Sequence, residues 1–123
     1  MLKKINIIRL KKEFEEIRTR GEIHQSPIFG LVTLDIRSEG ESRFGFVISK
    51  KISKKAVVRN KIRRLLAESV RVNLKNIKKG YLVLFLVKKE IIGMKFGEVE
   101  TEVKRMFERM GIKKQEKRLG VEG

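Results

Sequence analysis

Apolar residues recur every three to four positions in three parts of this chain, and this spacing predicts three amphipathic helices. The first helix is short and ends near Gly21, with an apolar face formed by Leu10, Phe14 and Ile17. The second runs for about five turns, and its inward positions are Val58, Ile62, Leu65, Leu66 and Val70. The third has an apolar face formed by Phe96, Val99, Val103, Met106, Phe107 and Met110.

Three other segments have the composition of β-strands. Residues 28–36 are rich in β-branched and apolar residues, and residues 43–48 alternate between larger apolar residues and other types. A turn over residues 38–42 separates these segments, so we expect them to pair as a hairpin. The run YLVLFLV over residues 81–87 is almost continuously apolar, as in a strand that is covered on both faces. Residues 111–123 show no periodicity, and we expect a loose, mildly basic tail there.

The length and the order of these elements favour a single α+β domain over residues 1–110 of the 123. The chain has no cysteine, which excludes disulfides, cysteine-ligated zinc and thiol chemistry. It shows no secretory signal pattern and no apolar stretch long enough to span a membrane. We therefore expect a cytoplasmic protein with no membrane partner.

Positive charge is concentrated in one segment. Eight lysines and arginines lie between Lys50 and Arg64, and they account for half of the formal net charge of +16. No acidic residue occurs between Glu41 and Glu68, so no neighbour in the sequence neutralises this segment. Because arginine binds oxyanions through two parallel hydrogen bonds, the pattern is typical of a nucleic-acid-binding surface. The alternative is a solvated helix face stabilised by salt bridges.

Candidates for catalysis or metal binding are few. His24 is the only histidine and Asp35 the only aspartate, and neither has the sequence neighbours of a metal site or a nucleophilic triad. No glycine-rich phosphate-binding loop occurs. The glutamates that cluster on the predicted helix faces are expected to be solvated, and they are Glu13, Glu15, Glu16, Glu98, Glu100 and Glu102. The sequence therefore predicts no catalytic residue and no metal ligand in the protein.

Base stacking requires exposed aromatic rings. Most phenylalanines of the chain are better explained as core residues, since phenylalanine is usually buried; this applies above all to Phe85, Phe96 and Phe107. The candidates for exposed rings are Phe14, Phe29 and Tyr81.

The stretch SKKISKKAVVRNKIRR, over residues 49–64, resembles the signature of the bacterial ribonuclease P protein subunit. That signature reads approximately S-K-K-x-G-x-A-V-x-R-N-x-x-[KR]-R-x-x-R, and the residues that match it here are Ser49, Lys50, Lys51, Ala56, Val57, Arg59, Asn60, Arg63 and Arg64. The order of elements over residues 1–110 also fits this family. Two positions depart from the signature: Ser53 stands where glycine is usual, and Ala67 stands where the motif ends in arginine.

The resemblance implies both a fold and a function. The implied fold is an αβββαβα sandwich with a four-stranded sheet and a left-handed βαβ crossover, shared with a domain of a small-subunit ribosomal protein. The implied function is that of the protein subunit of ribonuclease P, a ribonucleoprotein endoribonuclease that removes the 5′ leader of precursor tRNA. The RNA subunit and its Mg²⁺ ions would carry out the hydrolysis, and the protein would bind the ribonuclease P RNA and the precursor tRNA.

The charge pattern and the resemblance together predict two binding sites. Residues assigned to the catalytic RNA are Lys50, Lys51, Lys54, Lys55, Arg59, Asn60, Lys61, Arg63, Arg64 and Arg71, and we expect Arg59, Arg63 and Arg71 close to one side of the helix. The resemblance places the leader in a cleft lined by Phe14, Phe29 and Val32. Aromatic residues that the family often has at two positions are replaced here by Arg18 and Val32. A structural protein of the ribosome, an autonomous nuclease and a DNA-binding module are the alternative functions.

Overall fold

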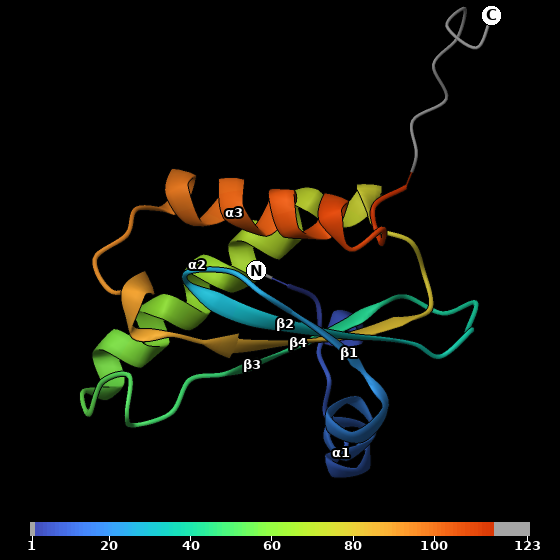
Figure 1. The fold of residues 1–123 in the computed structure, drawn as a ribbon, viewed down its shortest axis with the longest axis horizontal. Coiled ribbons are helices and arrows are strands. Elements are labelled where there is room, and N and C mark those ends of the chain that lie inside the picture. Colours follow the sequence, from blue (N-terminus) through green and yellow to red (C-terminus); the bar gives the residue numbers. More distant parts are fainter. Residues whose placement is uncertain (1, 115–123) are drawn as a thin grey trace, which may run out of the picture.

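A computed structural model of the protein describes residues 2–114. These residues form a four-stranded sheet that carries two long helices on one face and one shorter helix on the other (Figure 1). The elements in chain order are η1 (Lys4–Asn6), α1 (Lys11–Arg20), β1 (Glu22–Gln25), β2 (Phe29–Asp35), β3 (Arg43–Val47), α2 (Ala56–Asn73), η2 (Leu74–Asn76), β4 (Tyr81–Val87), η3 (Lys89–Ile91) and α3 (Phe96–Arg109). The predicted αβββαβα order is therefore confirmed.

The strands lie in the order β1-β2-β4-β3, with β4 antiparallel to β2 and parallel to β3. The hairpin expected between residues 28–36 and 43–48 is wrong, because β4 lies between these two strands. The almost continuous apolar sequence of β4 explains its central place, since a central strand is covered on both faces and paired on both edges. The hairpin partner of β2 is instead β1, which contains one apolar residue, Ile23, and therefore lacks the alternation that identifies a strand.

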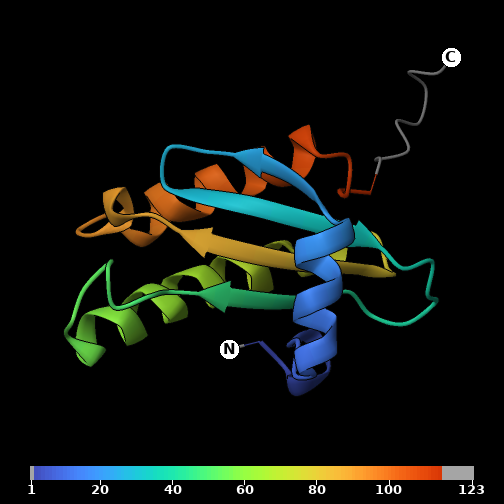
Figure 2. The same cartoon turned by 60° about the horizontal axis from the view of Figure 1, so that its bottom comes forward.

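The connection from β3 through α2 to β4 is a left-handed crossover. In Figure 2 both strands point to the left, β4 lies above β3, and α2 lies behind the sheet. Crossovers between parallel strands are right-handed in about 98% of cases, so the spacing of elements alone would predict the opposite hand. The handedness that the family resemblance implies is the one observed.

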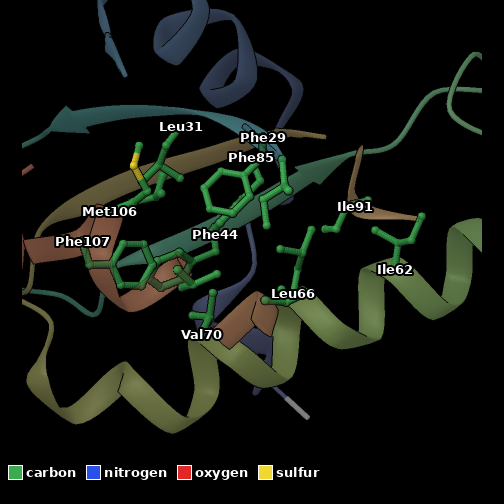
Figure 3. Close-up of a cluster of buried hydrophobic side chains, with 14 of the residues drawn as sticks. Phe29, Leu31, Phe44, Ile62, Leu66, Val70, Phe85, Ile91, Met106 and Phe107 are labelled. Carbon is green, nitrogen blue, oxygen red and sulfur yellow. The ribbon is translucent and has the colours of Figure 1, made fainter. Parts of the chain in front are cut away.

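The main core lies between the sheet and the two long helices (Figure 3). Phe85 of β4 is its centre, with ring centroids 5.0 Å from Phe29, 5.2 Å from Phe46 and 6.2 Å from Phe107. Each fully buried large apolar side chain contributes about 1.5–3 kcal/mol to the stability of the fold. The inward positions predicted for the two long helices are confirmed except at Phe96, which is 38% exposed because it is the first residue of α3.

The opposite face of the sheet is covered only in part. Ile17 of α1 packs with Val32, Leu34 and side chains of β4 in a second, smaller cluster. Gly45 of β3 allows α1 to lie close to the sheet, because a Cβ atom at this position would lie only 2.9 Å from the ring of Phe14. Figure 2 shows that α1 crosses one end of the sheet and leaves the other end open.

The folded region extends beyond the predicted end at residue 110. Ile112 is fully buried in the main core, and Ile77 forms a β-bridge with Lys113. The rest of the predicted tail, residues 115–123, lies outside the described residues. No helix within residues 2–114 is long and apolar enough to cross a membrane.

Candidate nucleic-acid interface

The predicted RNA-binding residues form one continuous surface on the loop after β3 and on α2. All of them are exposed to solvent except Arg59, which is half-buried. The positions facing the core are Ile62, Leu66 and Val70, so the basic residues of this amphipathic helix occupy the solvent side. We call the surface formed by Lys50, Lys51, Lys54, Lys55, Lys61, Arg63 and Arg64 the basic surface.

Arg59 makes a contact within the protein that the sequence did not predict. Its Nη1 donates a hydrogen bond of 2.8 Å to the backbone carbonyl oxygen of Ser53, so the side chain folds over the preceding loop. The hydroxyl of Ser53 accepts a hydrogen bond from the backbone N–H of Lys55. Ser53 does not adopt a positive φ, which explains why this loop tolerates serine where the family usually has glycine. Arg59 therefore holds the loop in place, and it lies one turn before Arg63 on the same side of α2.

The basic surface carries charge that the protein does not neutralise. Within residues 2–114, none of its seven cations forms an ion pair. Arg63 donates a hydrogen bond to the neutral Asn60 side chain. The N-terminus of α2 begins inside this surface, and its helix dipole adds further positive potential. The salt-bridged helix face that was the alternative is therefore not formed on the basic surface within residues 2–114.

Arg71 differs from the rest, since it pairs with Glu68 at 2.6 Å. The Arg71 guanidinium lowers the pKa of Glu68 to about 2, so this carboxylate is charged at neutral pH. Arg71 lies one to two turns beyond the basic surface, and its charge is already compensated in part.

The three residues predicted for the leader cleft do not all lie on one face of the sheet. Phe29 is fully buried on the helix-covered face, where it packs edge-to-face on Phe85, so it belongs to the core. Val32 lies on the opposite face but is only 5% exposed, because it packs against Ile17 of α1 in the second, smaller cluster. Phe14 is half-buried on α1 and rests against Gly45. Of the three, Phe14 alone offers appreciable surface.

Other residues form the open part of this face. Ile23 is 51% exposed and lies opposite Val32, and Val47 is 41% exposed and lies opposite Leu86. Ile23 and Val47 lie on the two edge strands, and with Phe14 and Leu86 they are the partly exposed apolar side chains of this face, which we call the apolar strip. The sequence pattern did not reveal this strip, because β1 was not recognised and the strand order that places Val47 next to Leu86 is a tertiary feature.

Three of the glutamates expected to be solvated make structural contacts instead. Glu13 is buried and pairs with the Arg43 guanidinium: Arg43 Nη1 donates a hydrogen bond of 2.9 Å to one carboxylate oxygen, and Nη2 lies 2.5 Å from the other. Glu100 accepts a hydrogen bond from Asn73 of α2. Glu102 accepts one from Ser26, and hydrogen bonds from Arg105 together with that from Ser26 lower its pKa. These contacts fasten α1, α2 and α3 to their neighbours.

His24 contacts Glu22 on the same strand, with 2.8 Å between His24 Nε2 and Glu22 Oε1. Residues 2–114 contain no group of three or more His, Asp or Glu side chains placed to hold a metal ion.

Comparison with known proteins decides the family. A family model described as Ribonuclease P matches residues 2–111. The chain belongs to the ribonuclease P protein family. The ribonuclease P protein component of Clostridium botulinum strain 657 is 34% identical to it over 110 residues, which are 89% of this chain and 97% of the relative. The component from Pelotomaculum thermopropionicum is 29% identical over 111 residues, 90% of this chain and 97% of the relative.

Solved structures of ribonuclease P proteins share the fold. The protein from Thermotoga maritima has a TM-score of 0.76 and 26% sequence identity, and the match covers 84% of this chain and 96% of that one. The protein from Staphylococcus aureus has a TM-score of 0.79 at 21% identity, covering 89% and 98%. The predicted resemblance is confirmed. Membership of this family makes the chain part of a ribonuclease P ribonucleoprotein, with the ribonuclease P RNA as its RNA partner.

Proposed function

We propose that this protein binds the ribonuclease P RNA through the basic surface and holds the 5′ leader of precursor tRNA on the open face of the sheet. The observation that carries the first part is the absence of ion pairs on the basic surface within residues 2–114. Unpaired, exposed cations bind phosphates and release the counterions condensed on RNA, which provides a large favourable entropy.

The open face supports the second part. Its strip of Phe14, Ile23, Val47 and Leu86 is apolar and partly exposed, and it contains a ring on which a base can stack. Stacking is tolerant of sequence, because every base has a flat π-face. The leader site in this proposal therefore differs from the predicted one, since Phe14 is retained and Phe29 is not included.

The division of labour follows from the family. In this proposal the Mg²⁺ ions held by the RNA subunit carry out the hydrolysis of the phosphodiester bond. The protein contributes binding energy and reduces the repulsion between the phosphates of the two RNAs. The two surfaces lie on opposite sides of the sheet, so both RNAs can bind at the same time (Figure 2).

Reconstitution tests the proposal. The protein is added to ribonuclease P RNA at a magnesium concentration too low for the RNA alone to cleave, and removal of the precursor tRNA leader is measured. We expect the protein to restore cleavage. A failure to restore it would leave a structural RNA-binding role, and cleavage by the protein in the absence of the RNA subunit would instead indicate an autonomous nuclease.

A further inference from the structure

A groove of about 570 Å³ lies at the end of α2 that is distant from the basic surface. The end of α2 and η2, the β2–β3 loop, the start of β4 and the segment after α3 meet there, at the right of Figure 1. Val72 and Leu74 are among its apolar lining residues, and the cations that line it are Arg71, Lys75, Lys79 and Lys114. We call this site the distal groove.

The cations of the distal groove exceed its acids. Lys79 lies 3.6 Å from Glu41, with both side chains exposed, and such a pair contributes little. Lys75 and Lys114 form no ion pair within residues 2–114. The negative end of the α2 dipole accounts for a cation such as Lys75 at a helix C-terminus. It does not account for Lys79 and Lys114, which come from separate segments.

The position of the groove indicates which RNA it faces. Arg64 and Arg71 are seven residues apart, so they lie on nearly the same line along α2, about 10 Å from each other. The distal groove thus continues the exposed side of α2 that begins with the basic surface. It lies at the end of the sheet that α1 crosses, beside α2 and away from the open end of the face that α1 covers in part (Figure 2).

We propose that the distal groove binds the sugar–phosphate backbone of the ribonuclease P RNA as a second contact, separate from the basic surface. Lys75 and Lys114 bind phosphate oxygens, and Val72, which is 40% exposed, packs against a ribose or a base. The inference rests on the proposed function, because it deepens the same RNA interaction. Two contacts along one helix would fix the orientation of α2 on the RNA, which a single cluster of flexible lysines cannot do.

The first test measures the affinity of the full-length protein for ribonuclease P RNA at several salt concentrations. The variant K75Q/K114Q removes two unpaired charges from the groove. The control K12Q/K104Q removes the same charge from exposed positions on α1 and α3. We expect the groove variant to bind roughly 2- to 30-fold more weakly and to reduce the slope of log K against log salt by about 1.4–1.8. Equal affinities and slopes for the two variants would overturn the inference.

The second test maps the contact directly, since the chain has no native cysteine. Val72→Cys in the groove and Val57→Cys beside the basic surface each carry an Fe(II)–EDTA group in the reconstituted holoenzyme. We expect the two probes to cleave ribonuclease P RNA at two separate sets of nucleotides. Cleavage of precursor tRNA instead of ribonuclease P RNA by the Val72→Cys probe, or cleavage of neither RNA, would overturn the inference.

The same experiments separate this inference from the proposed function. If R63A/R64A weakens binding and the Val57→Cys probe cleaves the RNA while both groove tests fail, the basic surface alone binds the RNA. If R63A/R64A also leaves the affinity unchanged, the proposed function fails as well.

Discussion

Glu13 was expected to be solvated, but the structure places it in a buried ion pair. It lies among other charged residues on α1, as a solvated side chain would, yet its carboxylate is buried against the Arg43 guanidinium. We predict that Glu13→Gln lowers the free energy of unfolding by about 1–3 kcal/mol, because it leaves a partly buried cation without its partner. Chemical denaturation measures this. Glu15→Gln, at an exposed position of the same helix, is the control, and an equal loss in both variants would contradict a specific role for the pair.

Phe14 is the residue on which the leader site depends most. Phe14→Leu keeps an apolar side chain against Gly45 but removes the flat ring. We predict that it weakens binding of leader-bearing precursor tRNA by the holoenzyme roughly 5- to 150-fold, since a stacked base contributes about 1–3 kcal/mol, and that leaderless tRNA binds almost as before. Comparison of the two dissociation constants checks this. Equal losses for both RNAs would mean that Phe14 is a core residue only.

Among the elements, α2 packs against the core with one side and exposes basic residues for RNA binding on the other. We predict that K61A/R63A/R64A reduces the affinity for ribonuclease P RNA roughly 3- to 150-fold, since each exposed charge contributes on the order of 0.2–1 kcal/mol, while the midpoint of thermal unfolding stays unchanged. Binding and thermal denaturation, measured on the same preparation, test both parts. Unfolding of this variant would show that the outward side of α2 is structural.

Arg59 on the same helix provides a contrast. Because its guanidinium holds the Ser53 carbonyl, Arg59→Ala should destabilise the loop and the start of α2 by about 0.5–1.5 kcal/mol. Hydrogen exchange of the amides over residues 52–58 reports this opening. Faster exchange in the Arg59→Ala variant but not in Arg63→Ala is the expected pattern, and identical exchange in both would contradict the structural role.

At the scale of the whole molecule, the net charge of +16 should dominate binding. With about six to ten phosphate contacts, the affinity for ribonuclease P RNA should fall roughly 10³- to 10⁵-fold between 50 and 200 mM salt. Titrations at graded salt concentrations measure the slope. A nearly flat response would contradict binding driven by phosphate contacts. Leader binding on the open face should depend on salt less steeply, because stacking contributes a larger share there.

Much of the architecture could be predicted from the residues. The helical periods of α2 and α3 are strong, since an amphipathic helix needs one apolar face whatever it packs against. The almost continuously apolar sequence YLVLFLV indicates that β4 is a central strand, covered on both faces. By contrast, β1 has a single apolar residue, and the pairing of β2 with β4 joins segments about fifty positions apart in sequence. Local patterns contain no information on such pairings, which explains the wrongly expected hairpin.

The same division applies to the sites. The basic surface could be located by composition, because charge without nearby acids is visible in one dimension. The burial of single side chains could not be predicted in this way. Burial is what distinguishes Phe29, in the core, from Phe14, on the open face. Nor could the distal groove be predicted, since Glu41 and Lys114 join Lys75 and Lys79 only when segments far apart in the sequence meet.

The sequence by itself determined the three α-helices, three of the four strands, the charge and the family. Periodicity, composition and the motif over residues 49–64 are local properties of the chain. The tertiary structure alone decided the strand order, which of the charged side chains are paired, and which aromatic ring is accessible. These depend on contacts between distant segments, whose formation reflects packing of the whole core and not the preference of any one segment.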